Sequence, residues 1–188
     1  MRFNEIKDKL FEAANQVKVK DSHLLLHDIN EPAISHRLAM YLTPKFTDFD
    51  VDCEYNGNID AESGRKYINL LITEARALGL INVDAPPVDN GPDEQIINRP
   101  VYPDIIVHKR GHNGKENNLL IIEVKKSSSR VNGQWDALKL SRFTSKEYEN
   151  DFDYCFGAFV RFDVGNRQPD FNVVWYKDGQ KYNDRNTA

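Results

Sequence analysis

Three charged side chains interrupt two apolar segments of this chain, and together they could do chemistry. Asp104 follows Pro103 and opens the apolar run Ile105–His108, whereas Glu123 and Lys125 lie near the end of a second apolar run. A charged group is costly to bury unless it is paired or binds a metal. Carboxylate oxygens are the ligands that hard cations such as Mg²⁺ prefer, and a lysine can stabilise negative charge on a phosphate. These residues therefore indicate metal-assisted cleavage of a phosphodiester bond.

Both segments are predicted to be β-strands whose turn brings the three groups together. Side chains alternate along a strand, so one face is expected to carry Leu119, Ile121, Glu123 and Lys125, and the other Leu120, Ile122, Val124 and Lys126. Glu123 and Lys125 are two residues apart on their common face, so they are expected to lie about 7 Å apart along the strand. Asn113-Gly114, in the loop between the segments, is a strong hairpin signal. A turn there places the start of the first strand beside the end of the second.

This arrangement resembles the PD-(D/E)xK nuclease superfamily, whose signature is Pro-Asp followed by Asp/Glu-x-Lys on the next strand. The matching residues, in order, are Pro103, Asp104, Glu123 and Lys125, and the resemblance extends over about residues 31–176. It implies an α/β protein with a restriction-endonuclease-like core, in which helices flank a mixed central β-sheet in the order αβββαβ.

The resemblance also implies a cofactor and roles for the signature residues. Mg²⁺, for which Mn²⁺ can substitute, would be held by Asp104, Glu123 and the backbone carbonyl of Val124. Lys125 would approach the attacked phosphate, either as a base whose pKa falls beside the metal or as a stabiliser of charge. Nucleic acid, with DNA as the expected form, would be the substrate. Whether the chain also forms a homodimer or binds a partner protein is left open by the resemblance.

Glu31 has two interpretations. It lies three residues before Ile34 and seven before Leu38, on the core-facing stripe of a predicted helix. Many members of the superfamily place a glutamate on this helix near the metal, which makes Glu31 a further candidate ligand. Alternatively, an acid in the first turn simply stabilises the helix through its dipole, by about 0.3–1 kcal/mol.

Three more residues are candidate contacts to the nucleic-acid backbone. Lys126 follows the signature directly, and Gln134 and Lys139 lie on the next predicted helix. Ordinary surface positions are the alternative explanation for the two helical residues.

Each signature residue also has a purely structural explanation. Asp104 could be a turn acid after Pro103, and Glu123 and Lys125 could form a salt bridge at a sheet edge. On that interpretation the chain is a catalytically inactive nucleic-acid- or protein-binding module on the same fold. The intact Asp104, Glu123 and Lys125, in the right order, favour the nuclease.

Periodicity and turn residues predict the elements that must position these groups. Helices are expected over Asn4–Lys18, from Asn30 to before Pro44 and over Gln134–Thr144, and strands over Phe49–Tyr55, Tyr154–Phe162 and Asn172–Tyr176. The segment Tyr67–Leu80 is ambiguous, and its apolar residues fit a helix better than a strand. We expect the first helix to pack outside the catalytic core. The predicted organisation is one nuclease-like domain over residues 1–188, with an N-terminal helix at 1–20 and an irregular insertion at about 56–100.

Composition limits the function classes further. The chain has 188 residues and a net charge of −4, so it lacks the overall basic character of many nucleic-acid-binding proteins. Its longest apolar runs are too short to cross a membrane, and its first residues lack a signal-peptide core. Cys53 and Cys155 are expected to be buried, reduced thiols, which favours a cytoplasmic location. The five histidines show no metal-ligand spacing.

Overall fold

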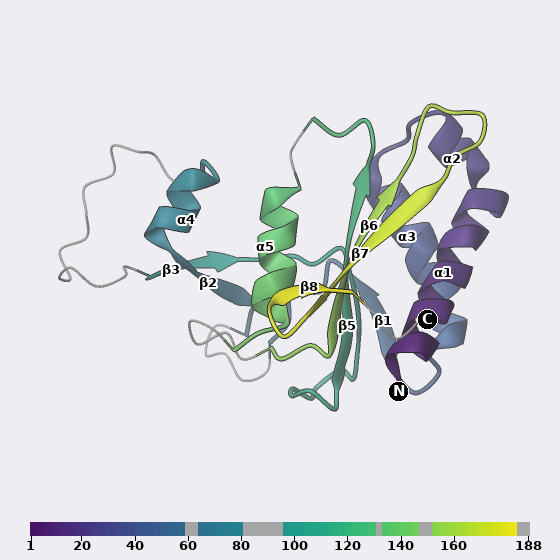
Figure 1. The fold of residues 1–188 in the computed structure, drawn as a ribbon. Coiled ribbons are helices and arrows are strands. Elements are labelled where there is room, and N and C mark those ends of the chain that lie inside the picture. Colours follow the sequence, from purple (N-terminus) through teal and green to yellow (C-terminus); the bar gives the residue numbers. More distant parts are fainter. Residues whose placement is uncertain (59–63, 81–95, 131–132, 147–151, 184–188) are drawn as a thin grey trace.

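A six-stranded β-sheet forms the centre of the molecule (Figure 1). The computed structural model describes residues 1–58, 64–80, 96–130, 133–146 and 152–183. In spatial order the strands are β1 (Asp50–Cys53), β4 (Ile105–His108), β5 (Asn118–Lys126), β6 (Phe156–Phe162), β7 (Phe171–Lys177) and β8 (Gln180–Tyr182). Neighbouring strands are antiparallel except β5 and β6, which are parallel. The predicted mixed α/β class is therefore confirmed.

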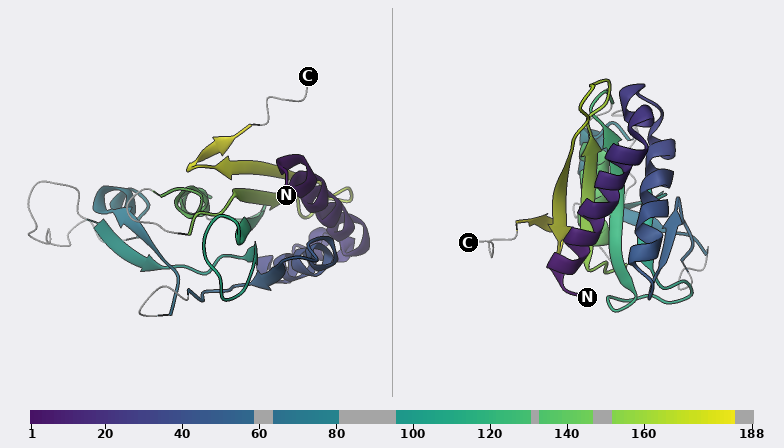
Figure 2. Two further views of the ribbon diagram at one scale, coloured as in Figure 1. Left: turned by 90° about the horizontal axis from the view of Figure 1, so that it is seen from below. Right: turned by 90° about the vertical axis from the view of Figure 1, so that its right-hand side faces the viewer.

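Helices cover both faces of this sheet (Figure 2). The parallel pair β5–β6 requires a crossover, which α5 (Gln134–Phe143) supplies on one face. The other face carries α1 (Phe3–Lys20) and α3 (Glu31–Leu42), with the short helix α2 (Ser22–Leu26) between them and the 3₁₀ turn η1 (Thr43–Lys45) after them. The result is three layers, with β5 in the interior of the middle one.

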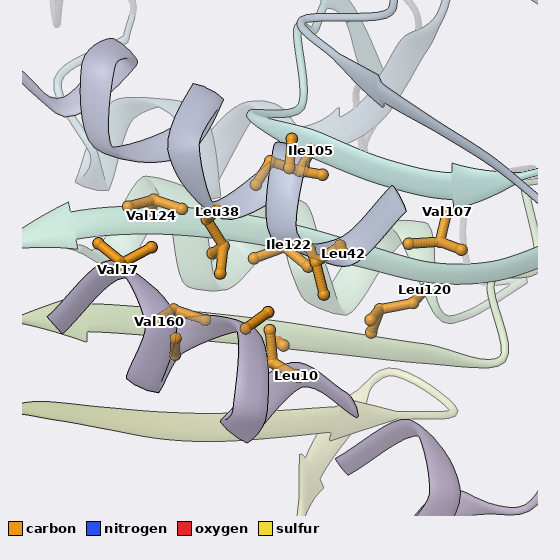
Figure 3. Close-up of a cluster of buried hydrophobic side chains, with 14 of the residues drawn as sticks. Leu10, Val17, Leu38, Leu42, Ile105, Val107, Leu120, Ile122, Val124 and Val160 are labelled. Atoms are coloured by element: carbon orange, nitrogen blue, oxygen red, sulfur yellow. The ribbon is translucent and has the colours of Figure 1, made fainter. Parts of the chain in front are cut away.

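The N-terminal helix belongs to the core, so the expectation that it packs outside was wrong. Its apolar residues are fully buried: Ile6, Leu10, Ala13, Ala14 and Val17. They pack with α3 against β4, β5 and β6, where Leu38, Ile122 and Val160 also lie (Figure 3). The amphipathic pattern correctly located the buried stripe, but it carries no information about which surface that stripe covers.

The strands at the centre divide their side chains between two apolar clusters. Ile105, Ile122 and Val124 face α1 and α3, whereas Ile106 and Ile121 pack with residues of α5. This alternation confirms the predicted faces, except for one residue.

Leu119 does not follow the predicted alternation, because it joins the cluster that contains Leu120. The pairing of β4 with β5 is irregular at this point: Val107 is opposite Leu120 and His108 is opposite Asn118. A bulge of this kind inserts one extra residue and interrupts the alternation of side chains.

The insertion between β1 and β4 forms a small sheet of its own. β2 (Tyr67–Leu71) pairs with β3 (Ile96–Pro100), and α4 (Ile72–Ala77) follows β2 directly. The predicted helix over Tyr67–Leu80 is therefore right only in its middle part. Ile68 and Leu70 alternate with less buried neighbours, a period-two pattern that overlaps the helical one. The predicted irregular stretch includes residues 96–100, which form β3, and its proline-rich part lies outside the described residues.

Other local predictions have clear outcomes. Asn30 caps α3, because its side chain accepts a hydrogen bond from the Ala33 N–H at 3.0 Å. Cys53 and Cys155 are free thiols as expected, but Cys53 is exposed and Cys155 half-buried. Of the helices in the described ranges, none is both long and apolar enough to cross a membrane.

Truncating one core side chain of α1 tests its place in the fold. Leu10→Ala should lower the free energy of unfolding by about 2–5 kcal/mol, because Leu10 is fully buried between α1 and the sheet. Val19→Ala on the same helix, where Val19 is 74% exposed, should change it by less than about 0.5 kcal/mol. Urea unfolding measures both. Equally small effects would show that α1 does not share the core.

Candidate active site

The β4–β5 hairpin brings the predicted carboxylates together. Ile105 is opposite Ile122 in this antiparallel pair. Asp104, one residue before Ile105, and Glu123, one residue after Ile122, therefore lie at the same end of the two strands. The Val124 N–H donates a hydrogen bond of 2.7 Å to Asp104 Oδ2, which ties the two strands at this point. Burial raises the pKa of the Asp104 carboxyl above its usual value, although this hydrogen bond opposes the rise. The juxtaposition expected from the turn is confirmed.

Glu123 is the most buried member of the site. It is 1% exposed, and its Oε2 lies 2.6 Å from Lys139 Nζ. Its other oxygen, Oε1, is buried and has no hydrogen-bond partner within the described ranges. Burial raises the pKa of Glu123 well above its usual value, the Lys139 ammonium opposes this, and the charges of Asp104 and Asp136 add to it. Glu123 thus has one neutralised oxygen and one oxygen that is free to bind something.

Lys125 lies between two acids rather than against Glu123. Its Nζ is 3.0 Å from Asp136 Oδ2 and 3.7 Å from Glu31 Oε2. Burial by itself would lower the pKa of Lys125, but the hydrogen bond to Asp136 and the negative charges of Asp136, Glu31 and Asp104 outweigh it and raise the pKa. The ammonium therefore stays charged at neutral pH in this arrangement, which favours charge stabilisation over the role of a base.

Asp136 and Lys139 on α5 complete the site, and Asp136 was not predicted. Lys139 Nζ is 3.2 Å from Asp136 Oδ1, and both side chains are buried. A signal was present, since these two residues continue the buried stripe of Leu140 and Phe143 at helical spacing. Two opposite charges on an apolar stripe indicate buried partners elsewhere in the fold.

The predicted nucleic-acid contact through Lys139 does not fit its position. Lys139 is 7% exposed and binds Glu123 and Asp136, so it is neither an ordinary surface residue nor free to contact a phosphate. Lys126 pairs with Asp28 at 2.7 Å, and Gln134 is exposed in the first turn of α5. Of the three candidates, Gln134 and Lys126 remain near the surface beside the site.

Glu31 reaches the end of β5, although it stands at the start of α3. Its Oε1 accepts a hydrogen bond of 3.1 Å from the Lys126 N–H, and its Oε2 faces Lys125. A purely local role at the helix terminus is thus incomplete, because the carboxylate also fixes the strand end that carries the signature. Glu31 thus contacts the Lys125 ammonium and the backbone of Lys126, and its role as a metal ligand stays a prediction.

The donor set determines which metal could bind. Throughout the described segments, no group of three or more His, Cys, Asp or Glu side chains is arranged to hold an ion. A closed protein cage is therefore not formed by these side chains. Mg²⁺, however, usually takes only one or two carboxylates and keeps several waters. The unpartnered Oε1 of Glu123, with Asp104 at the same end of the hairpin, fits such a hydrated ion, and the Val124 carbonyl stays a predicted third ligand.

The central position of Asp136 can be tested by removing its charge. Asp136→Asn leaves two ammonium groups, the buried one of Lys139 and the half-buried one of Lys125, with one carboxylate partner fewer. Loss of one partner of a buried ion pair costs about 3–5 kcal/mol. The matched variant Asp170→Asn breaks a pair with Lys18 in which the Asp170 side chain is 68% exposed, and should cost much less stability because exposed pairs contribute little. Similar losses in urea unfolding would contradict the assigned network.

The raised pKa of Glu123 predicts a pH dependence of stability. The folded protein holds more protons than the unfolded chain between the usual pKa of 4.5 and the raised folded value. The free energy of unfolding therefore falls as pH rises through this interval. In chelator, wild type should gain stability relative to Glu123→Gln as pH is lowered from 7 toward about 4.5. A difference between the two proteins that is constant with pH would show that Glu123 ionises normally.

Comparisons of the chain with models of known protein families, with curated proteins and with solved structures found no match.

Proposed function

We propose that this chain is a Mg²⁺-dependent nuclease of the PD-(D/E)xK type that hydrolyses phosphodiester bonds of DNA. The observation that carries the proposal is the buried, unpartnered oxygen of Glu123 at the end of the strand pair that also carries Asp104. Buried carboxylate oxygens usually have a partner, and a bound cation is one way to supply it. Asp21 Oδ2 is also buried without a partner among the described residues, but Glu123 Oε1 belongs to the strand pair that carries Asp104. Lys125, on the same strand, supplies the positive charge that a phosphoryl substrate needs.

The order of the elements supports the same proposal. Along the chain, α3, β1, β4, β5, α5 and β6 follow the αβββαβ order of a restriction-endonuclease-like core. The β2–α4–β3 unit interrupts that order between β1 and β4.

Each residue of the proposed site would have a separate role. Asp104, Glu123 and the Val124 carbonyl would hold the ion, which supplies a water of lowered pKa and a Lewis acid for the phosphoryl oxygen. Lys125, kept charged by Asp136 at 3.0 Å, stabilises the negative charge that develops on the phosphate. Glu31 and Asp136 position Lys125 from two sides. We also propose a cytoplasmic location, because both cysteines are free thiols.

One observation favours a second candidate, a catalytically inactive nucleic-acid- or protein-binding module. Lys139 already neutralises Glu123 Oε2 at 2.6 Å, so a protein cation occupies part of the place that a metal would need. A site that has lost its metal would retain such a pair. The two candidates differ in whether a divalent cation binds to the folded protein.

Metal binding is the first test of the nuclease. The melting temperature of wild type should be higher in millimolar Mn²⁺ than in a metal-free sample prepared with chelator, because a ligand of the folded state stabilises that state by mass action. Asp104→Asn should abolish that increase, since it removes one of two carboxylate ligands. Asp170 is an exposed aspartate on the loop before β7, so the control variant Asp170→Asn should retain the Mn²⁺-dependent increase in melting temperature.

Cleavage of labelled single-stranded and duplex DNA, with RNA alongside, completes this test. Lys125→Gln should abolish cleavage and retain the Mn²⁺-dependent increase in melting temperature, because its charge acts on the transition state rather than on the ion. A melting temperature that is independent of Mn²⁺, together with no cleavage by wild type, would favour the inactive module.

A further inference from the structure

The sheet face that carries Glu123 and Lys125 is only partly covered. α5 packs over β5 and β6, and beside it a cavity of about 540 Å³ opens over β6, β7 and β8. The pairing places Lys125 opposite Arg161, Phe159 opposite Val174, and Tyr176 opposite Lys181. The cavity is therefore a continuation of the candidate active site across the sheet, reached directly from Lys125.

The floor of this groove is apolar and partly aromatic. It is made by Phe159, Val174 and Tyr176, with Ala137 of α5 at its side. Val174 is 36% exposed although it lies in the middle of a strand, Phe159 is half-buried, and Tyr176 is only 5% exposed. Part of the floor is therefore open to a ligand. An apolar floor beside a charged site suits the flat face of a ring.

The rim of the groove is basic and, within the described part of the chain, contains no carboxylate. Its charged residues are Lys125, Lys126, Arg130, Arg161 and Lys181. Lys125 and Lys126 have acidic partners, in Asp136 and Asp28. The other three rim cations form no ion pair with any described carboxylate, and Arg161 donates a hydrogen bond to the Ser127 carbonyl.

Two basic residues of the β4–β5 loop, in contrast, have acidic partners. Arg110 is held by Asp52, and Lys115 is 3.2 Å from Asp178. Three cations that pair with no described carboxylate, Arg130, Arg161 and Lys181, thus line one groove in a protein of net charge −4. Local concentration of one charge sign attracts an oppositely charged ligand.

The groove is longer than a single small anion requires. A second, more apolar hollow of about 650 Å³ shares Gln134, Ala137, Tyr176 and Lys181 with it and continues between α5, α4 and the β7–β8 turn. Together the two hollows form a path that begins at Lys125 and leads away from the site. A path of this form suits an extended chain.

We infer that this groove binds single-stranded nucleic acid, with bases on the accessible Phe159–Val174 part of the floor and phosphates along the Arg130–Arg161–Lys181 rim. The inference rests on the proposed nuclease activity, because it is that activity which makes the anionic chain a nucleic acid. Unpaired bases can stack on an exposed apolar floor, whereas a duplex keeps the faces of its bases stacked on each other. The strand would then leave the groove at Lys125, where the phosphodiester is cut.

Binding of a labelled oligonucleotide of about 10 nucleotides, measured by fluorescence anisotropy in chelator, tests the groove without cleavage. The double variant Arg161→Gln/Lys181→Gln should bind at least about tenfold more weakly than wild type. Its plot of log affinity against log salt concentration should be less steep, by about 0.7 for each phosphate that the protein no longer neutralises. The control Lys7→Gln/Lys20→Gln removes two charges from α1, on the opposite face of the sheet, and should bind like wild type.

Comparison of ligands tests the floor. An abasic chain of equal length, and a duplex, should bind wild type more weakly, by about fivefold or more for each base that no longer stacks. Val174→Ser should weaken binding of the oligonucleotide and leave binding of the abasic chain unchanged. Equal affinity for all three ligands, or for wild type and the Arg161→Gln/Lys181→Gln variant, would overturn the inference. DNA and RNA oligonucleotides of one sequence show which form is preferred.

The two proposals fail in different ways. The Arg161→Gln/Lys181→Gln variant should keep the full Mn²⁺-dependent rise in melting temperature. Metal binding and cleavage by wild type, with oligonucleotide binding unaffected by this variant, would refute the groove alone. Groove-dependent binding of oligonucleotides without metal binding would refute the nuclease and support a binding module that uses the same surface.

Discussion

The burial of the Glu123 carboxylate is the constraint on which the arrangement of the site depends. An isolated charge in an apolar strand is costly, and here the Lys139 ammonium compensates it at 2.6 Å. Lys139 in turn shares Asp136 with Lys125, so one chain of alternating charges joins β5 to α5. Because a buried charge tolerates little displacement from its partner, these pairs fix the helix over the strand as well as its side chains.

The two faces of the sheet differ in the side chains that they carry. The face under α1 and α3 is apolar and holds the larger cluster of fully buried side chains (Figure 3). The face under α5 carries the charges and then opens into the groove over β7 and β8. A single strand, β5, serves both, since alternation sends Ile122 and Val124 to one side and Glu123 and Lys125 to the other. The larger apolar cluster and the buried charges thereby lie on opposite faces of one sheet.

The Lys139–Glu123 pair has a consequence for the proposed activity. Buried ion pairs often add little net stability, because the cost of desolvation offsets the attraction. Under the proposed function, the pair keeps the protein folded in the absence of a metal by supplying one positive charge to an otherwise crowded group of acids. A divalent cation then has to share Glu123 with Lys139, or displace it, and the unpartnered Oε1 is the oxygen available for sharing.

Local sequence patterns determined much of this protein. The helical stripe from Ile6 to Val17, the Asn30 cap and the hairpin that aligns Asp104 with Glu123 could all be predicted, because periodicity, capping and turn chemistry involve residues close in the chain. Only the tertiary structure decided what those elements pack against. It placed α1 in the core, paired β2 with β3, and supplied Lys139 to Glu123 and Asp136 to Lys125. The physical reason is that an apolar stripe or a buried charge requires a partner, whereas the identity of that partner depends on contacts between residues distant in the sequence.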